Sequence, residues 1–197
     1  MFFSFGKKKV DALVIALGNP GEKYLKTRHN AAWLLLDESF PDLDWSFDKY
    51  LNSQKAFIVH NEKEILFLRP QTMMNNSGQT LSAARKRFQF DQKNLIVAHD
   101  DVDLQLGKIK LSFDRGDAGH NGVASIVSAI GQTFVRMRIG ISTKLHDDSL
   151  EKRDVLGRFM STELAELKAL STNFQKIIFK ITEDGYEVAM NEFNKKV

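Results

Sequence analysis

Histidines, carboxylates and amides recur in short motifs that could carry out hydrolysis. Residues 27–30 read TRHN, residues 99–103 read HDDVD and residues 119–122 read GHNG. A neutral histidine can take a proton from an attacking water near pH 7, and a carboxylate can orient its ring. Asparagine amides donate and accept hydrogen bonds without titrating, so they could hold a substrate backbone or polarise a carbonyl. Cleavage of an acyl ester by activated water is one chemistry open to these residues.

Each motif also has a simpler local interpretation. The GNPG at residues 18–21 is typical of a turn, and Asn75 or Asn76 could cap the helix that follows. HDDVD could be a loop of solvated carboxylates. GHNG offers backbone N–H groups to an anion, but capping of the next helix competes with that interpretation. Taken singly, the motifs favour turns and caps.

Apolar runs and helical periodicity predict the elements that must position these motifs. Continuous apolar runs indicate buried strands, and apolar residues spaced by three and four indicate amphipathic helices. The pattern predicts a single α/β domain: a mixed, mostly parallel twisted sheet with helices on both faces and a long C-terminal helix. The predicted strands are residues 12–17, 55–60, 64–69, 95–99, 108–113 and 134–142, and the predicted helices are 31–40, 77–88, 122–131 and one from Ser161 onward.

The polar motifs follow the ends of predicted strands. Ligands bind parallel sheets at the carboxyl ends of the strands, in the loops that come next. Asn19 and His29 come after the first strand, Asn75 after the 64–69 strand, and Asp100 after the 95–99 strand, while Asn121 opens a helix. We therefore expect these side chains to gather at one edge of one sheet.

Composition and missing signatures exclude several classes. The 197 residues are 43% hydrophobic and 27% charged, with a net charge of +3 and no cysteine. The charge excess is too small to indicate a nucleic-acid partner by itself, and disulfides and thiolate metal sites are excluded. No H-E-x-x-H, G-x-S-x-G or G-x-G-x-x-G motif occurs, which counts against a metal site, a serine hydrolase and a dinucleotide-binding fold. We expect a soluble cytoplasmic protein without a membrane partner.

Five motifs in order resemble one known family. The segments LGNPGEKYLKTRHNAAW, RPQTMMNNSGQ, VAHDDVDLQLGKIKL, AGHNG and RMRIGIS are similar to successive motifs of bacterial-type peptidyl-tRNA hydrolases. The resemblance runs from about Leu13 to Phe159. It implies hydrolysis of the ester that joins a peptide to tRNA, with peptidyl-tRNA as partner, no metal or other cofactor, and a monomer.

The resemblance also implies roles for individual residues. His29 matches the catalytic base and Asp100 the carboxylate that orients it, while Arg138 and Lys110 are assigned to tRNA phosphate contacts. The residues assigned to substrate binding are Asn19, Tyr24, Met74, Asn75, His120 and Asn121. Which asparagine stabilises the oxyanion stays open.

The sequence departs from the family pattern in places. Ser112 stands where the family has the basic partner of Arg138, so either Lys110 or Arg115 could substitute. Residues 143–154 lack the usual glycine-proline pattern, and a lid over the substrate competes with a solvated connection. Residues 1–10 form an extension before the hydrolase-like domain, residues 11–197, and a flexible tail is favoured over a basic arm. The alternative function is a non-catalytic RNA-binding member of the same fold family.

Overall fold

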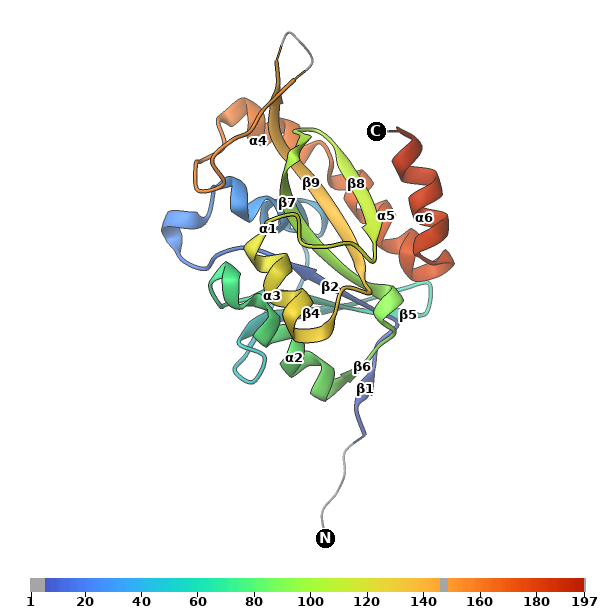
Figure 1. Cartoon of the computed structure of the whole chain (residues 1–197). Coiled ribbons are helices and arrows are strands. Elements are labelled where there is room, and N and C mark those ends of the chain that lie inside the picture. The colour runs from blue at the N-terminus through green and yellow to red at the C-terminus, as the bar shows by residue number, and fades with distance from the viewer. Residues whose placement is uncertain (1–5, 146–148, 197) are drawn as a thin grey trace.

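The computed structural model describes residues 6–145 and 149–196. At its centre lie four mutually parallel strands in the order β5–β2–β7–β9. Antiparallel strands extend this core at both edges (Figure 1), which confirms the predicted mixed, mostly parallel sheet. The parallel strands are β2 (Ala12–Ala16), β5 (Lys63–Pro70), β7 (Leu95–Gln105) and β9 (Val135–Lys144), and the antiparallel ones are β3 (Ser46–Asp48), β4 (Ser53–His60), β8 (Ile109–Phe113) and β10 (Leu150–Glu151).

The turn between β4 and β5 has the geometry that its sequence position predicts. Asn61 and Glu62 both have positive φ, 46° and 63°. Two consecutive left-handed residues match the twist of the flanking strands in a two-residue hairpin. The register continues to His60 opposite Lys63, so the predicted strand pair is confirmed.

Helices cover both faces of the sheet, as the continuous apolar strands require (Figure 1). The side chains of β2 divide between two cores: Val14 packs with the C-terminal helices, whereas Leu13 and Ile15 face α2 and α3. One face carries α2 (Ser77–Arg87) and α3 (Asn121–Ile130), and the other carries α1 (Ala31–Ser39), α4 (Ser161–Lys168), α5 (Ser171–Asp184) and α6 (Tyr186–Phe193).

The long C-terminal helix expected from Ser161 onward is divided into three. The chain turns at Ala169 and Leu170 between α4 and α5, and Gly185, with φ of 89°, ends α5. Glycine adopts that backbone angle without steric cost, so α6 starts in a new direction and packs on α5. Apolar spacing of three and four runs from Leu164 through Leu170 to Ile181, across the first break, which is why periodicity predicted one helix.

The N-terminal extension is docked where the structure describes it. Strand β1 (Lys8–Lys9) pairs in parallel with β6 (Phe88–Gln89), and Val10 is buried. Residues 1–5 of the extension and residues 146–148 of the 143–154 segment, for which a lid and a solvated connection were both open, lie outside the described residues. Within the described part of the chain, no helix is long and apolar enough to cross a membrane.

Candidate active site

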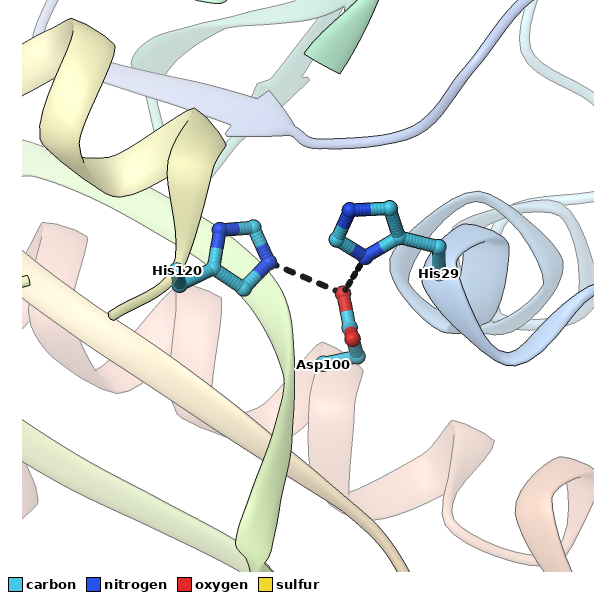
Figure 2. A group of neighbouring side chains, drawn as sticks. All are labelled: His29, Asp100 and His120. Carbon is cyan, nitrogen blue, oxygen red and sulfur yellow. Dashed lines mark hydrogen bonds and ion pairs between the residues drawn. The ribbon is translucent and has the colours of Figure 1, made fainter. Parts of the chain in front are cut away.

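Three segments that are distant in sequence bring His29, Asp100 and His120 together (Figure 2). His29 comes from the 3-10 turn η2 (Arg28–Asn30), Asp100 from β7 and His120 from the N-cap of α3. His29 Nδ1 and His120 Nε2 each lie 2.9 Å from the same oxygen, Asp100 Oδ1. The Asp100 carboxylate is buried, with 1% of the residue exposed. The prediction that these motifs meet is therefore confirmed for this trio.

Asp100 lies inside a strand, and its expected position in a loop was wrong. Strand β7 continues through the charged HDDVD motif to Gln105. Asp101, one residue later, points away from Asp100 and pairs with Arg138, whose Nε lies 2.6 Å from Asp101 Oδ2. Because each carboxylate has a partner on its own side, the strand tolerates two consecutive buried charges.

Backbone contacts set the tautomer of His120. Its Nδ1 accepts hydrogen bonds from the backbone N–H groups of Gly122 and Val123, at 3.1 and 3.3 Å, and so caps α3. A nitrogen that accepts carries no proton, so the ring proton sits on Nε2 and is donated to Asp100. Both ring nitrogens of His120 are thereby occupied, which makes it a group that positions Asp100. The sequence had suggested a substrate contact for it.

The same carboxylate orients His29. Asp100 stays ionised: burial alone would raise its pKa, but His120 and His29 hold the pKa of this carboxyl well below its usual range. An ionised carboxylate oxygen accepts from both neighbours, so His29 Nδ1 carries a proton and donates it. The Nε2 of neutral His29 is then unprotonated, and Figure 2 shows it on the side of the ring away from Asp100.

A third histidine, His99, is excluded as a base. Burial first, and then the charges of His120 and Arg136, hold its pKa well below the ordinary value. Its Nδ1 donates to the backbone oxygen of Asp100 at 2.7 Å, and its Nε2 accepts from Arg136 Nε at 3.3 Å. With 1% of its surface exposed, His99 is a neutral core residue.

Asn30 is a site residue that the sequence left without a role. It is completely buried, and its Oδ1 accepts from the backbone N–H of Asn19 at 2.8 Å while its Nδ2 donates to the Asn19 carbonyl at 3.0 Å. Asn19 Oδ1 in turn accepts from the backbone N–H of Met74 at 2.8 Å. The residue next to His29 therefore fixes Asn19 and, through it, the turn η3 (Met74–Asn76).

The other predicted substrate residues differ in exposure. Asn75 and Asn121 are exposed at the starts of α2 and α3, Tyr24 is half-buried, and Met74 is buried against Gly122. Asn121 lines a cavity of about 130 Å³ together with His29, Asp100, His120 and Val155. Asn19, Tyr24, Met74 and Asn75 do not line this cavity.

Arg28 anchors η2, the turn that carries His29. Its partner is too distant in sequence for any local motif to include it. Arg28 and Glu163 form a buried ion pair, with Nη2 to Oε2 at 2.7 Å, across 135 residues of chain. The backbone N–H groups of Arg28 and His29 donate to the carbonyls of Gly157 and Val155. The segment that follows residues 143–154 thus holds the backbone of His29 in place.

A basic hollow lies on the β8–β9 edge of the sheet. Strand register places Lys110 opposite Arg138 and Ser112 opposite Arg136. The hollow measures about 480 Å³, and Ser112 Oγ is buried in it without a hydrogen-bond partner. The cationic residues that line it are Lys110, Arg115, Arg136 and Arg138.

The His29, Asp100 and His120 donor atoms lie within 4.8 Å of one another, close enough to be considered for a metal ion. Binding at His120 Nε2 would require the ring proton to move to Nδ1, where two backbone N–H groups already point. The proton on His29 Nδ1 would also have to leave. The donor set is therefore arranged for hydrogen bonds and fits a metal poorly.

This fold and this cluster define an α/β enzyme-like domain with a histidine–aspartate pair placed to activate water. The sequence profile of the peptidyl-tRNA hydrolase family matches residues 13–197. A peptidyl-tRNA hydrolase from Dichelobacter nodosus is 37% identical over 187 residues, covering 91% of this chain and 96% of that protein.

Solved structures agree. The crystal structure of peptidyl-tRNA hydrolase from Acinetobacter baumannii superposes with a TM-score of 0.79 at 28% identity, covering 96% of this chain and 97% of the other. A complex of peptidyl-tRNA hydrolase with N-propanol gives a TM-score of 0.78 at 27% identity, with coverage of 96% and 97%. The chain belongs to the peptidyl-tRNA hydrolase family, and so to a family of enzymes.

Proposed function

We propose that this protein cleaves the ester bond of peptidyl-tRNA by activating water at His29. The observation that carries the proposal is the 2.9 Å contact from His29 Nδ1 to Asp100 Oδ1, which leaves Nε2 as the proton acceptor. The ring lines a cavity open to a substrate. Family membership supplies the substrate class.

Each of three residues has a separate role in the proposed reaction. His29 Nε2 takes a proton from water while the water oxygen attacks the ester carbonyl. Asp100 holds the tautomer and stabilises the imidazolium without accepting the proton. The protonated His29 then gives that proton to the departing ribose oxygen. His120, fixed by the start of α3, keeps Asp100 in position.

We assign the asparagines to the substrate. Asn19 Oδ1 is already used by the Met74 N–H, so its Nδ2 is the end available to donate. Asn121 lines the catalytic cavity from the start of α3. Asn75 stands exposed at the start of α2, so the peptide portion is assigned to the surface between these helices.

On the tRNA side, we propose that the basic hollow binds a phosphate. Arg138 is held by Asp101 through Nε, which leaves its terminal nitrogens for an anion. Lys110 stands opposite Arg138, and Arg115 lines the same hollow, so both compensate for the uncharged Ser112. We also propose that the protein acts as a monomer and needs no metal ion.

The deciding experiment measures release of an N-blocked amino acid from tRNA, with and without EDTA. His29→Ala should lower turnover roughly 100- to 10,000-fold, the usual contribution of a general base. The matched control is His60→Ala, because His60 lies on the β4–β5 hairpin and pairs with Glu183. Full activity in His29→Ala would refute the assigned base, and an inactive but tRNA-binding unmutated protein would favour the non-catalytic RNA-binding alternative.

A further inference from the structure

Two basic clusters that are far apart in sequence form one surface at the end of the sheet away from the catalytic cavity. The pairing of β1 with β6 lays Lys8 opposite Phe88 and Lys9 opposite Gln89. This pairing places the N-terminal lysines beside the last turn of α2. We call the exposed cations there the β1–β6 basic surface: Lys7, Lys9, Arg85, Lys86 and Lys93.

The strand directs alternate lysines to opposite sides. Lys8 turns toward the core side, where its Nζ lies 2.6 Å from Glu64 Oε1 and 3.9 Å from the centre of the Phe57 ring. Lys7 and Lys9 therefore face the other way. Lys7 and Arg85 line a shared hollow of about 320 Å³, so the two clusters meet.

The charge on this surface is not neutralised. Lys8 pairs with Glu64 and Arg87 pairs with Asp48, whereas the five cations of the β1–β6 basic surface have no ion pair with any described residue. Asp91 is the one carboxylate that lines the hollow, and its Oδ1 accepts from the backbone of Lys93 as a cap.

Stabilisation of helix α2 explains some of these cations. Cations in the last turn of α2 favour the helix dipole, which accounts for Arg85 and Lys86. It does not account for Lys7, Lys9 or Lys93, which belong to other segments. Lys7 and Lys9 also precede residue 13, where the match to the family begins. Lys7 and Lys9 thus add positive charge from outside the part of the chain that matches the family.

We propose that the β1–β6 basic surface is a second contact for the phosphate backbone of tRNA. It is separate from the basic hollow at Arg138, and the assignment of tRNA as the RNA rests on the proposed function. Helix α2 begins beside Asn75 and ends at Arg87, and 11 helical residues span about 16 Å. The surface therefore lies at the opposite end of α2 from the turn that carries Asn75.

The test compares two double variants with a charge-matched control. Lys7→Ala/Lys9→Ala and Arg85→Ala/Lys86→Ala each remove two charges from the surface, and Lys168→Ala/Lys176→Ala removes two exposed lysines from α4 and α5. Fluorescence anisotropy with deacylated tRNA between 50 and 200 mM KCl gives affinity and its salt dependence. Each surface variant should lower the slope of log K against log salt by about 2, and the control should not.

Hydrolysis of a short CCA-ended ester substrate should be unchanged in both surface variants, because that substrate cannot reach the surface. An unchanged salt slope with tRNA would overturn the proposal. Binding to phosphatidylglycerol vesicles that the variants lose, with tRNA affinity unaltered, would also overturn it and assign a membrane instead. If the unmutated protein cleaves no ester but its tRNA binding still depends on these cations, this inference stands and the proposed function fails.

Discussion

Replacing Asn30 gives the sharpest test of how the site is positioned. Asn30 makes two hydrogen bonds to the backbone of Asn19 in a fully buried setting. Asn30→Ala would leave one buried N–H and one buried carbonyl without partners. At about 1–3 kcal/mol for each unsatisfied group, the free energy of unfolding should fall by roughly 2–6 kcal/mol.

The functional effect should exceed the loss of folded protein. Asn19 also accepts from the Met74 N–H, so a displaced Asn19 shifts the turn that carries Asn75. A misplacement near 1 Å costs roughly a hundredfold in rate, so kcat per folded molecule should fall by about that factor while tRNA affinity is retained. Asn30→Asp keeps the acceptor but turns a carboxylate oxygen toward the buried Asn19 carbonyl, so it should be at least as destabilising as Asn30→Ala and still impaired in kcat.

Asn194 offers a matched control, because it makes the same pair of bonds to the backbone of Leu111, at 2.8 and 3.0 Å. Asn194→Ala should lower stability without changing turnover of a short ester substrate. The assays are chemical denaturation and single-turnover hydrolysis, each at a temperature where the variants stay folded. Equal kcat per folded molecule in Asn30→Ala and the unmutated protein would refute the positioning role.

Two further changes test the remaining parts of the site. Glu163→Gln, which breaks the buried pair with Arg28, should cost about 3–5 kcal/mol of unfolding free energy. Burial raises the pKa of Glu163, but the Met160 N–H and Arg28 outweigh it and lower that pKa overall. The stabilisation from ionised Glu163 is therefore fully present above the pKa of the unfolded state, near ~4.3, and is lost as pH falls through the lower pKa of the folded state. The stability of the variant should consequently depend less on pH in the acid range. An identical acid-unfolding profile in the two proteins would contradict this. Ser112→Lys should tighten tRNA binding and steepen its salt dependence by about 1, and weaker binding would argue against a phosphate in the hollow.

The resemblance predicted the pairing of His29 with Asp100, but it gave His120 a substrate contact, and the sequence did not predict the element that holds Asp100. The three closely spaced charges at Asp100, Asp101 and Asp103 favour a solvated loop when only neighbouring residues are considered. In the fold, Asp100 meets His29 across 71 residues and Asp101 meets Arg138 across 37. These partners make buried charge tolerable in a strand. Because the partners are distant in sequence, a local pattern cannot reveal them.

Residues that were assigned no role from the sequence also have partners outside their local motif. Asn30 and Arg28 lie inside TRHN, yet Asn30 acts on Asn19 and Arg28 on Glu163, 135 residues away. Apolar periodicity was sufficient to place β2, β4, β5, β8, β9 and the earlier helices, whereas the short strands β1, β3, β6 and β10 and the second half of β7 were not predicted. The expected C-terminal helix is divided at two places, at Ala169–Leu170 and at Gly185, and only the second carries a residue, glycine, that marks a break in the sequence.

The fold also distinguishes His29 from His120 as a candidate for the proposed base. His29 and His120 make contacts of equal length to one oxygen, so distance to Asp100 cannot distinguish them. His120 uses its second nitrogen to accept two backbone N–H groups of α3, and a proton placed there would face both donors. Among the described residues, none makes such a contact with Nε2 of His29, which lies on the cavity wall. The start of a helix therefore occupies one histidine fully and leaves the other free to take a proton from water.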